Sequence, residues 1–231
     1  MYYLRVNKEG GDFLGQYNTV IFDLDGTLLD TIADLTDSVN YVLSAYGFPS
    51  RSRAEIRSFI GNGVRKLMQR AVPEQIGDSV FAELFATFKT YYMAHCAVKT
   101  RPYDGIPELL RELKAAGFRL AVVSNKHDAA VKALTEQFFP GLIDVSIGQR
   151  EGVPLKPAPD MVEIALTQIG AARRQAIYVG DSEVDSATAV AAGLPLILVA
   201  WGFGDQDKLS RLAPKGLAKD AETLSERICL F

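Results

Sequence analysis

Short apolar runs alternate with longer segments of helical periodicity along much of the chain. Four runs rich in β-branched or aromatic residues end at a polar residue or a turn, as strands buried on both faces do. They are Thr19–Phe22, Arg119–Val123, Ala176–Val179 and Leu194–Ala200. Helical periodicity occupies Ile106–Ala116, Asp128–Phe138, Pro159–Ile169 and Ser182–Ala192. The alternation predicts an α/β fold built on a doubly wound parallel sheet.

Residues 31–100 break this alternation, because they carry helical periodicity without a strand-like run. The helical segments are Ile32–Tyr46, Arg53–Phe59, Gly63–Ala71 and Gln75–Met93. Both junctions of the interval lie beside the end of the first strand, so an inserted all-helical domain there is well placed to act as a lid. We therefore predict a core domain of residues 19–30 and 101–231, a helical cap domain of residues 31–100, and an N-terminal extension of residues 1–18 with a possible hairpin at residues 7–11.

Composition limits the classes of partner. Of 231 residues, 48% are hydrophobic, and the formal charge of −3 comes from interspersed acids and bases. The chain has no basic run of the kind that follows nucleic acid or anionic lipid, and its longest apolar run is too short to span a bilayer. Cys96 and Cys229 lack zinc or disulfide spacing. We expect a cytoplasmic protein that binds neither nucleic acid nor membrane.

Two aspartates lie two residues apart directly after the first apolar run. A carboxylate next to a buried strand costs stability unless a metal or another partner compensates it. Asp23 and Asp25 can face one cavity, the first as nucleophile and the second as proton donor. Gly26 and Thr27 then offer backbone and hydroxyl donors to an anion. Taken alone, such a pair is more often a capped turn ahead of a helix.

A second acidic pair follows the third apolar run. Asp181 comes directly after that run, and Asp185 lies one turn along the helix that begins there. Asp181 is also suited to capping this helix. However, the carboxyl ends of parallel strands meet at one edge of the sheet, which would bring Asp181 beside Asp23. Clustered carboxylates without fixed cations require a divalent ion, and an all-oxygen site without His or Cys favours Mg²⁺.

Three further polar residues lie at corresponding places along the chain. Ser124 and Asn125 end the second apolar run and offer a hydroxyl and an amide to phosphate oxygens, although such residues equally often just end strands. Lys156 lies in a segment stiffened by two prolines and supplies a positive charge, whereas most lysines are solvated surface residues. Each signal is weak alone, but their order on successive strand ends favours one phosphate site.

The sequence resembles the haloacid dehalogenase superfamily in all four of its short motifs. These motifs are Asp23–Thr27, Ser124, Lys156 and Gly180–Asp185. The resemblance implies a Rossmann-like core with a helical cap inserted after the first motif. It also implies that Asp23 is the nucleophile and Asp25 the general acid and base.

The same resemblance implies how phosphate and metal are held. Ser124 and Lys156 would bind the phosphoryl group. Mg²⁺ would be bound by Asp23, the backbone carbonyl of Asp25 and Asp181. Asp185 would support the metal site from close by.

Two features narrow the substrate. An acid at position 25 favours phosphate esters over haloacids, because a halide leaving group needs no proton. The cap segment Phe59–Leu67 is similar to the cap loop of phosphoglycolate phosphatases, in which Gly61 and Arg65 would contact substrate. An equally weighted alternative is that the glycines only separate two helices there and that Arg65 faces solvent.

The sequence therefore predicts a magnesium-dependent phosphatase that hydrolyses a small phosphorylated metabolite, 2-phosphoglycolate first, through a phosphoaspartate. A pyrophosphatase, a sugar-phosphate phosphatase and a phosphomutase of the same superfamily are alternatives. A phosphoacceptor signalling module also clusters aspartates, a Ser or Thr and a Lys around Mg²⁺, but the inserted cap and the distal acidic pair argue against it. The sequence is compatible with a monomer or a homodimer.

Overall fold

A five-stranded parallel sheet forms the centre of the computed structural model, which describes residues 17–213 and 216–230. Its spatial order is β5-β4-β1-β6-β7. The strands are β1 (Thr19–Phe22), β4 (Arg119–His127), β5 (Val145–Gln149), β6 (Ala176–Gly180) and β7 (Leu196–Leu198). The fold class predicted from the sequence is thus confirmed. The possible hairpin at residues 7–11 lies outside the described residues.

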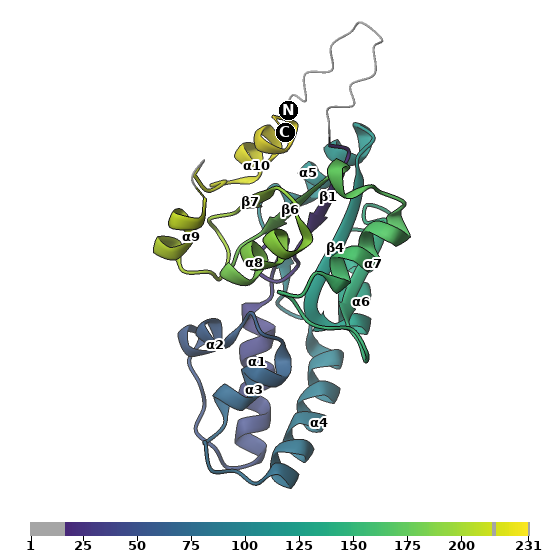
Figure 1. Cartoon of the computed structure of the whole chain (residues 1–231). Helices are drawn as coiled ribbons and strands as arrows, with labels where there is room; N and C mark the ends of the chain where they lie inside the picture. The colour runs from purple at the N-terminus through teal and green to yellow at the C-terminus, as the bar shows by residue number, and fades with distance from the viewer. Residues whose placement is uncertain (1–16, 214–215, 231) are drawn as a thin grey trace, which may run out of the picture.

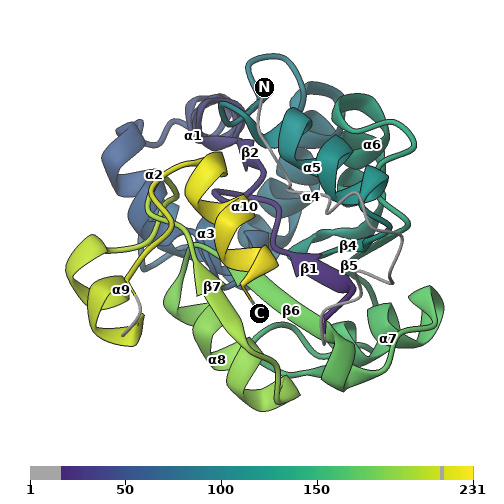
Figure 2. The ribbon, with the colours of Figure 1, turned by 90° about the horizontal axis from the view of Figure 1, so that it is seen from above.

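Strand β1 is fully buried at the middle of the sheet and separates two apolar layers. Val20 and Phe22 face one layer and Ile21 faces the other, as the two-residue period of a strand requires. Helices α5 (Ile106–Ala115), α6 (Asp128–Phe138) and α10 (Ala221–Cys229) cover the first face. Helices α7 (Asp160–Ile169) and α8 (Glu183–Ala192) cover the second. Figure 2 shows these helices on opposite sides of the strands.

The connection order places a crevice beside β1. The chain adds β4 and β5 on one side of β1, then β6 and β7 on the other. The connections from β1 therefore diverge, and the carboxyl ends of β1 and β6 border a topological switch point, where doubly wound sheets bind ligands. Asp23 and Asp181 are the residues that directly follow these two strands.

Helices α1–α4, which we call the cap, occupy the interval between β2 (Leu29–Asp30) and β3 (Arg101–Pro102). They are α1 (Ile32–Ala45), α2 (Arg53–Phe59), α3 (Val64–Ala71) and α4 (Asp78–His95). Figure 1 shows the cap at one end of the core, beyond the carboxyl ends of the strands. Because β2 pairs antiparallel with β3, the chain enters and leaves the cap through one two-stranded ribbon.

A buried carboxylate joins the two connections between cap and core. Asp34 in α1 is 2% exposed, and its oxygens accept hydrogen bonds from the backbone N–H groups of Lys99 and Thr100 at 2.8–2.9 Å. These amides lie where the chain leaves the cap. The start of the first cap helix is thereby tied to the exit from the cap.

Two of the predicted strands end at other residues in the structure. The last strand is confined to Leu196–Leu198 within the longer apolar run, and β4 extends to His127, past the predicted end at residue 123. Strand β5 was not predicted. Its sequence, VSIGQ, is only partly buried at the edge of the sheet, so it lacks the apolar run that identifies central strands.

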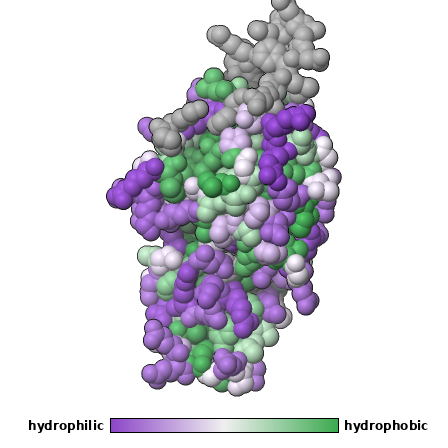
Figure 3. Space-filling model, in the orientation of Figure 1, coloured by the Kyte–Doolittle hydropathy of each residue, from purple (hydrophilic) through white to green (hydrophobic). Residues whose placement is uncertain are grey.

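None of the helices in the described residues is long and apolar enough to cross a membrane. On the face shown in Figure 3, hydrophilic residues are spread over both the core and the cap.

Candidate active site

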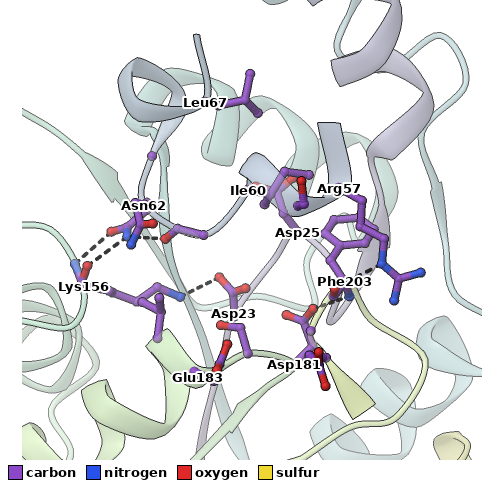
Figure 4. A pocket seen from close by; sticks show the side chains of 18 of the residues that line it. Asp23, Asp25, Arg57, Ile60, Asn62, Leu67, Lys156, Asp181, Glu183 and Phe203 are labelled. Atoms are coloured by element: carbon purple, nitrogen blue, oxygen red, sulfur yellow. Dashed lines mark hydrogen bonds and ion pairs between the residues drawn. The ribbon is translucent and has the colours of Figure 1, made fainter. Parts of the chain in front are cut away.

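Asp23 stands at the carboxyl end of β1, where it is 7% exposed. Its backbone N–H continues the sheet ladder by donating to the carbonyl of Val179 at 2.9 Å. Its Oδ1 accepts a hydrogen bond from the ammonium of Lys156 at 2.7 Å. Figure 4 shows this ion pair on the floor of the cavity. The buried strand therefore fixes the Asp23 backbone, and Lys156 fixes its carboxylate.

Lys156 is positioned by an amide clamp. Asn125 accepts a hydrogen bond from the Lys156 backbone N–H at 2.8 Å and donates its Nδ2 to the Lys156 carbonyl at 3.0 Å. The Lys156 ammonium also donates to Asp185 Oδ1 at 2.8 Å. Burial disfavours the charged ammonium, but Asp185 and Asp23 outweigh burial and raise the pKa of Lys156 well above its usual value. Lys156 is therefore a fixed cation beside Asp23.

Asp181 and Asp185 complete an acidic cluster with Asp23. Oxygen atoms of the three carboxylates lie within 4.8 Å of one another, and all three residues are buried. Asp185 has no exposed surface and accepts hydrogen bonds from Lys156, Tyr178 and Ser182. The Lys156 ammonium thus contacts two of the three carboxylates, those of Asp23 and Asp185.

The cluster raises the pKa of two of its members. Burial, opposed by Lys156 and assisted by the neighbouring acids, raises the pKa of Asp23 to about 7. Burial, together with the charges of Asp185 and Asp23, raises the pKa of Asp181 well above its usual range. A bound cation would relieve both penalties, since it stabilises the charged carboxylates. The crowded oxygen donors of these three carboxylates fit a hard divalent cation.

Asp181 is held between two loops. Thr27 donates its hydroxyl to Oδ1 at 3.2 Å, and the backbone N–H of Phe203 donates to Oδ2 at 2.6 Å. Glycine is required where these loops approach, because a Cβ at Gly26 or Gly202 would lie 2.3 Å from an oxygen of Asp181. Trp201 joins the two loops by donating its indole N–H to the carbonyl of Thr27 at 3.0 Å.

The Asp25 carboxylate lies in the cavity wall but outside the acidic cluster. Its Oδ1 accepts hydrogen bonds from the Thr31 hydroxyl and from the Lys126 ammonium, both at 2.6 Å. Thr31 directly precedes the first cap helix, so the position of Asp25 depends on both the core and the entry to the cap.

Lys126 is a site residue that the sequence analysis missed. Its side chain is 1% exposed, and its ammonium lies 4.9 Å from the centre of the Tyr92 ring in α4. The charge of Asp25 overcomes burial and raises the pKa of Lys126. Its place directly after Ser124 and Asn125 was the available signal, because β4 continues past the predicted end at residue 123 and carries all three residues to the cavity.

The cap and the core enclose one cavity of about 750 Å³ over these residues. Its core wall includes Ser124 and Asn125, and its cap wall includes Gly61 and Gly63. The cap loop contacts the core directly, since Asn125 donates its Nδ2 to the Gly61 carbonyl at 3.1 Å.

Arg65 is absent from the cavity wall among the described residues. Its guanidinium instead lies over the rings of Phe81 and Phe85, 5.2 and 5.4 Å from their centres. The basic residues of α2 and α3 that border the cavity are Arg57 and Arg70. The structure therefore brings together the predicted core residues and Gly61, and it leaves Arg65 outside.

The doubly wound sheet, the inserted helices and the acidic cluster at the switch point define a Rossmann-like protein with a helical cap and a carboxylate at the end of its central strand. The chain belongs to the haloacid dehalogenase-like hydrolase family, whose model matches residues 20–199. The resemblance inferred from the four short motifs is thus confirmed.

Individual relatives are similar over most of their length. A phosphoglycolate phosphatase of Mesorhizobium japonicum is 36% identical over 191 residues, which cover 81% of this chain and 84% of the relative. A phosphoglycolate phosphatase of Aquifex aeolicus is 31% identical over 185 residues, covering 80% and 85%. The crystal structure of a candidate phosphoglycolate phosphatase from Lactobacillus delbrueckii subsp. bulgaricus is 35% identical, superposes with a TM-score of 0.84, and covers 92% and 98%.

Proposed function

We propose that this protein is a magnesium-dependent phosphatase that hydrolyses 2-phosphoglycolate through a phosphoaspartate on Asp23. The single observation that carries the proposal is the placement of Asp23 in the cavity between cap and core, beside the Lys156 ammonium and the Asp181 carboxylate. An anion that attacks an anionic phosphate requires such charge compensation. When bound, Mg²⁺ would supply it as a Lewis acid, with Asp23, the Asp25 carbonyl and Asp181 as ligands and Asp185 as support.

The phosphoryl group would lie over Asp23 among donors from two segments. The Lys156 ammonium already contacts the attacking carboxylate and is close enough to neutralise a phosphate oxygen there. Ser124 and Asn125 border the same cavity from β4. The two donors expected after the nucleophile have partners within the protein instead: the Gly26 N–H donates to the Leu29 carbonyl at 2.9 Å, and the Thr27 hydroxyl donates to Asp181.

Asp25 would act as the general acid and then as the general base. Its carboxylate borders the cavity two residues beyond Asp23, which suits protonation of a leaving alkoxide on the far side of the phosphorus. After the alcohol leaves, Asp25 would take a proton from the water that attacks the phosphoaspartate. Thr31 and Lys126 restrict the orientation of Asp25 for both steps.

The substrate assignment rests on relatives and on the size of the site. The similar proteins from Mesorhizobium japonicum and Aquifex aeolicus are phosphoglycolate phosphatases. The cavity of about 750 Å³, which loops of both the cap and the core line, has room for a small phosphate ester. Gly61 borders the cavity from the cap and would contact the organic part of the substrate, while Arg65 would have to leave the Phe81 and Phe85 rings to do so.

A sugar phosphate is the second candidate. The structure of CbbY from Rhodobacter sphaeroides in complex with phosphate is 25% identical to this chain, has a TM-score of 0.67, and covers 81% of this chain and 88% of its own. Its similarity supports phosphate binding by a protein of this fold. It is lower than that of the phosphoglycolate phosphatases, which is why we place 2-phosphoglycolate first.

Phosphate release from a panel of compounds tests the proposal. The panel contains 2-phosphoglycolate, pyrophosphate, a hexose 1-phosphate and p-nitrophenyl phosphate, each assayed with Mg²⁺ and with excess chelator. We expect the highest kcat/KM for 2-phosphoglycolate and no release with chelator. Release from pyrophosphate alone would contradict the substrate, and undiminished release in chelator would contradict the metal dependence.

A further inference from the structure

One peptide group links the cap to the acidic cluster. The carbonyl of Gly202 accepts a hydrogen bond from Nη2 of Arg57 at 2.7 Å. The other end of the same peptide, the N–H of Phe203, donates to Asp181 Oδ2 at 2.6 Å. Arg57 also donates its Nε to the carbonyl of Phe203 at 3.1 Å. Figure 4 shows Arg57, Phe203 and Asp181 in line at the edge of the cavity.

The geometry of this link leaves little freedom between its ends. A peptide group is planar, so holding the Gly202 carbonyl also sets the direction of the Phe203 N–H. The loop packs tightly on the acid, because a Cβ at Gly202 would lie 2.3 Å from Asp181 Oδ2 and one at Gly204 would lie 2.2 Å from the Asp181 carbonyl oxygen. A movement of this peptide is therefore transmitted to Asp181.

Arg57 belongs to the cap, and the groups that it binds belong to the core. It is in α2, 145 residues before Gly202, and it borders the same cavity as Asp181. A hydrogen bond from a charged donor also polarises the peptide and strengthens the N–H on its other side as a donor. Docking of the cap and orientation of Asp181 thus share one hydrogen-bonded chain.

We propose that Arg57 is a positioning residue that couples docking of the cap to metal binding by Asp181, through the Gly202–Phe203 peptide. When the cap is docked, Arg57 holds the loop, and the Phe203 N–H holds Asp181 Oδ2 in one orientation within the acidic cluster. Coupling between two events is reciprocal, so a bound metal strengthens docking of the cap by the same factor.

Direct metal binding tests this role without an assay of turnover. The probe is Mn²⁺ in the absence of substrate, with free Mn²⁺ counted by electron paramagnetic resonance. Arg57→Ala should raise the Kd for Mn²⁺ about three- to tenfold, at the low end of couplings of this kind, and Arg57→Lys should lie between Arg57→Ala and the wild type. Arg53→Ala is the matched control, because Arg53 is an exposed arginine of the same helix outside the cavity wall.

The reciprocal effect provides a second readout. In wild-type protein, Mn²⁺ should slow amide hydrogen exchange in residues 53–59, and in Arg57→Ala it should not. Circular dichroism confirms that each variant is folded. The proposal would be overturned by equal Kd values for Arg57→Ala and Arg53→Ala. It would also be overturned if Mn²⁺ did not change amide hydrogen exchange in residues 53–59 of the wild-type protein.

The inference rests on the proposed metal site but not on the proposed substrate. If the wild type binds no Mn²⁺, the metal site itself is wrong. If wild type and variants bind Mn²⁺ equally, the site stands and only the role of Arg57 is wrong.

Discussion

Asp23 is the residue at which the demands of folding and of catalysis conflict. A carboxylate at this position is buried beside two other acids, and only Lys156 among its bonded partners carries the opposite charge. Burial therefore raises the pKa of Asp23 to about 7. The folded protein keeps this proton up to about pH 7, whereas the unfolded chain releases it near the ordinary pKa of 3.8.

This conflict predicts a pH-dependent gain in stability for Asp23→Asn. The contribution of Asp23 to stability is fully present below its unfolded pKa and is lost as pH rises through its folded pKa. Asp23 therefore destabilises the folded protein strongly at pH 8 and only slightly at pH 5. In chelator-treated protein, Asp23→Asn should raise Tm by about 5 °C at pH 8 and by clearly less at pH 5. These values already include the loss of stability from the weaker hydrogen bond between Asn and Lys156. Thermal unfolding at both pH values measures this, and a larger gain at pH 5 would contradict it.

Lys126 sets the orientation of Asp25, so its loss should affect turnover more than substrate binding. Lys126→Met should lower kcat for 2-phosphoglycolate at least about tenfold with little change in KM, because general acid catalysis depends on the position of the acid. Lys132→Met is the control, since Lys132 forms an exposed ion pair with Asp128 on α6. Steady-state kinetics on both variants would contradict the role of Lys126 if their kcat values agreed within about twofold.

Among the individual site residues, those predicted most directly from the sequence are the charged residues that end apolar runs. Asp23 and Asp181 are identifiable because a charge after a buried strand needs an explanation. Lys126 was missed because the second apolar run ends at residue 123, whereas β4 continues to His127 and carries Lys126 to the cavity. Arg65 was predicted from the similarity of the segment Phe59–Leu67 to a cap loop, and that similarity does not give the phase of the helix, which places the Arg65 guanidinium over two phenylalanine rings.

The connections between elements matter as much as the elements. The β2–β3 ribbon carries both passages between the core and the cap, and Asp34 binds the amides at the cap exit. Its carboxylate is 2% exposed, so those amides have little access to water as an alternative partner.

Removing this carboxylate should destabilise the protein. Asp34→Ala should lower the free energy of unfolding by about 2–4 kcal/mol, because it removes the acceptor of both N–H groups and leaves that of Thr100 buried without a partner. Asp37→Ala should cost at most about 1 kcal/mol, since Asp37 lies in the same helix and forms an exposed ion pair with the Lys99 ammonium at 2.5 Å. Urea unfolding measures both values, and equal losses would show that the buried acceptor does not matter.

Element positions follow from the sequence where burial is complete. The central strands β1, β4 and β6 were predicted close to their observed starts, since each is an apolar run. Strand β5 was not predicted, because an edge strand exposes one side and its sequence can then be polar. The division into a core domain and a cap domain at residues 31 and 100 stays a prediction.

On the scale of the whole molecule, the candidate active site is formed by segments that are far apart in sequence. Thr27 and Asp181 are 154 residues apart and share a hydrogen bond, and Lys156 contacts Asp23 across 133 residues. The topology rule for doubly wound sheets brings these strand ends together, which is why the core site was predictable. No such rule relates the cap to the core, and the contacts of Arg57 and Tyr92 required the structure.

The central claim is that Asp23 is phosphorylated during turnover. Its most direct test is acid quenching of the wild-type enzyme during steady-state hydrolysis of 2-phosphoglycolate with Mg²⁺, followed by digestion and mass spectrometry. The account predicts one phosphoryl group on the peptide that contains Asp23, and none in Asp23→Asn, which should be folded and inactive. Phosphate on a different residue, or full turnover by Asp23→Asn, would contradict it.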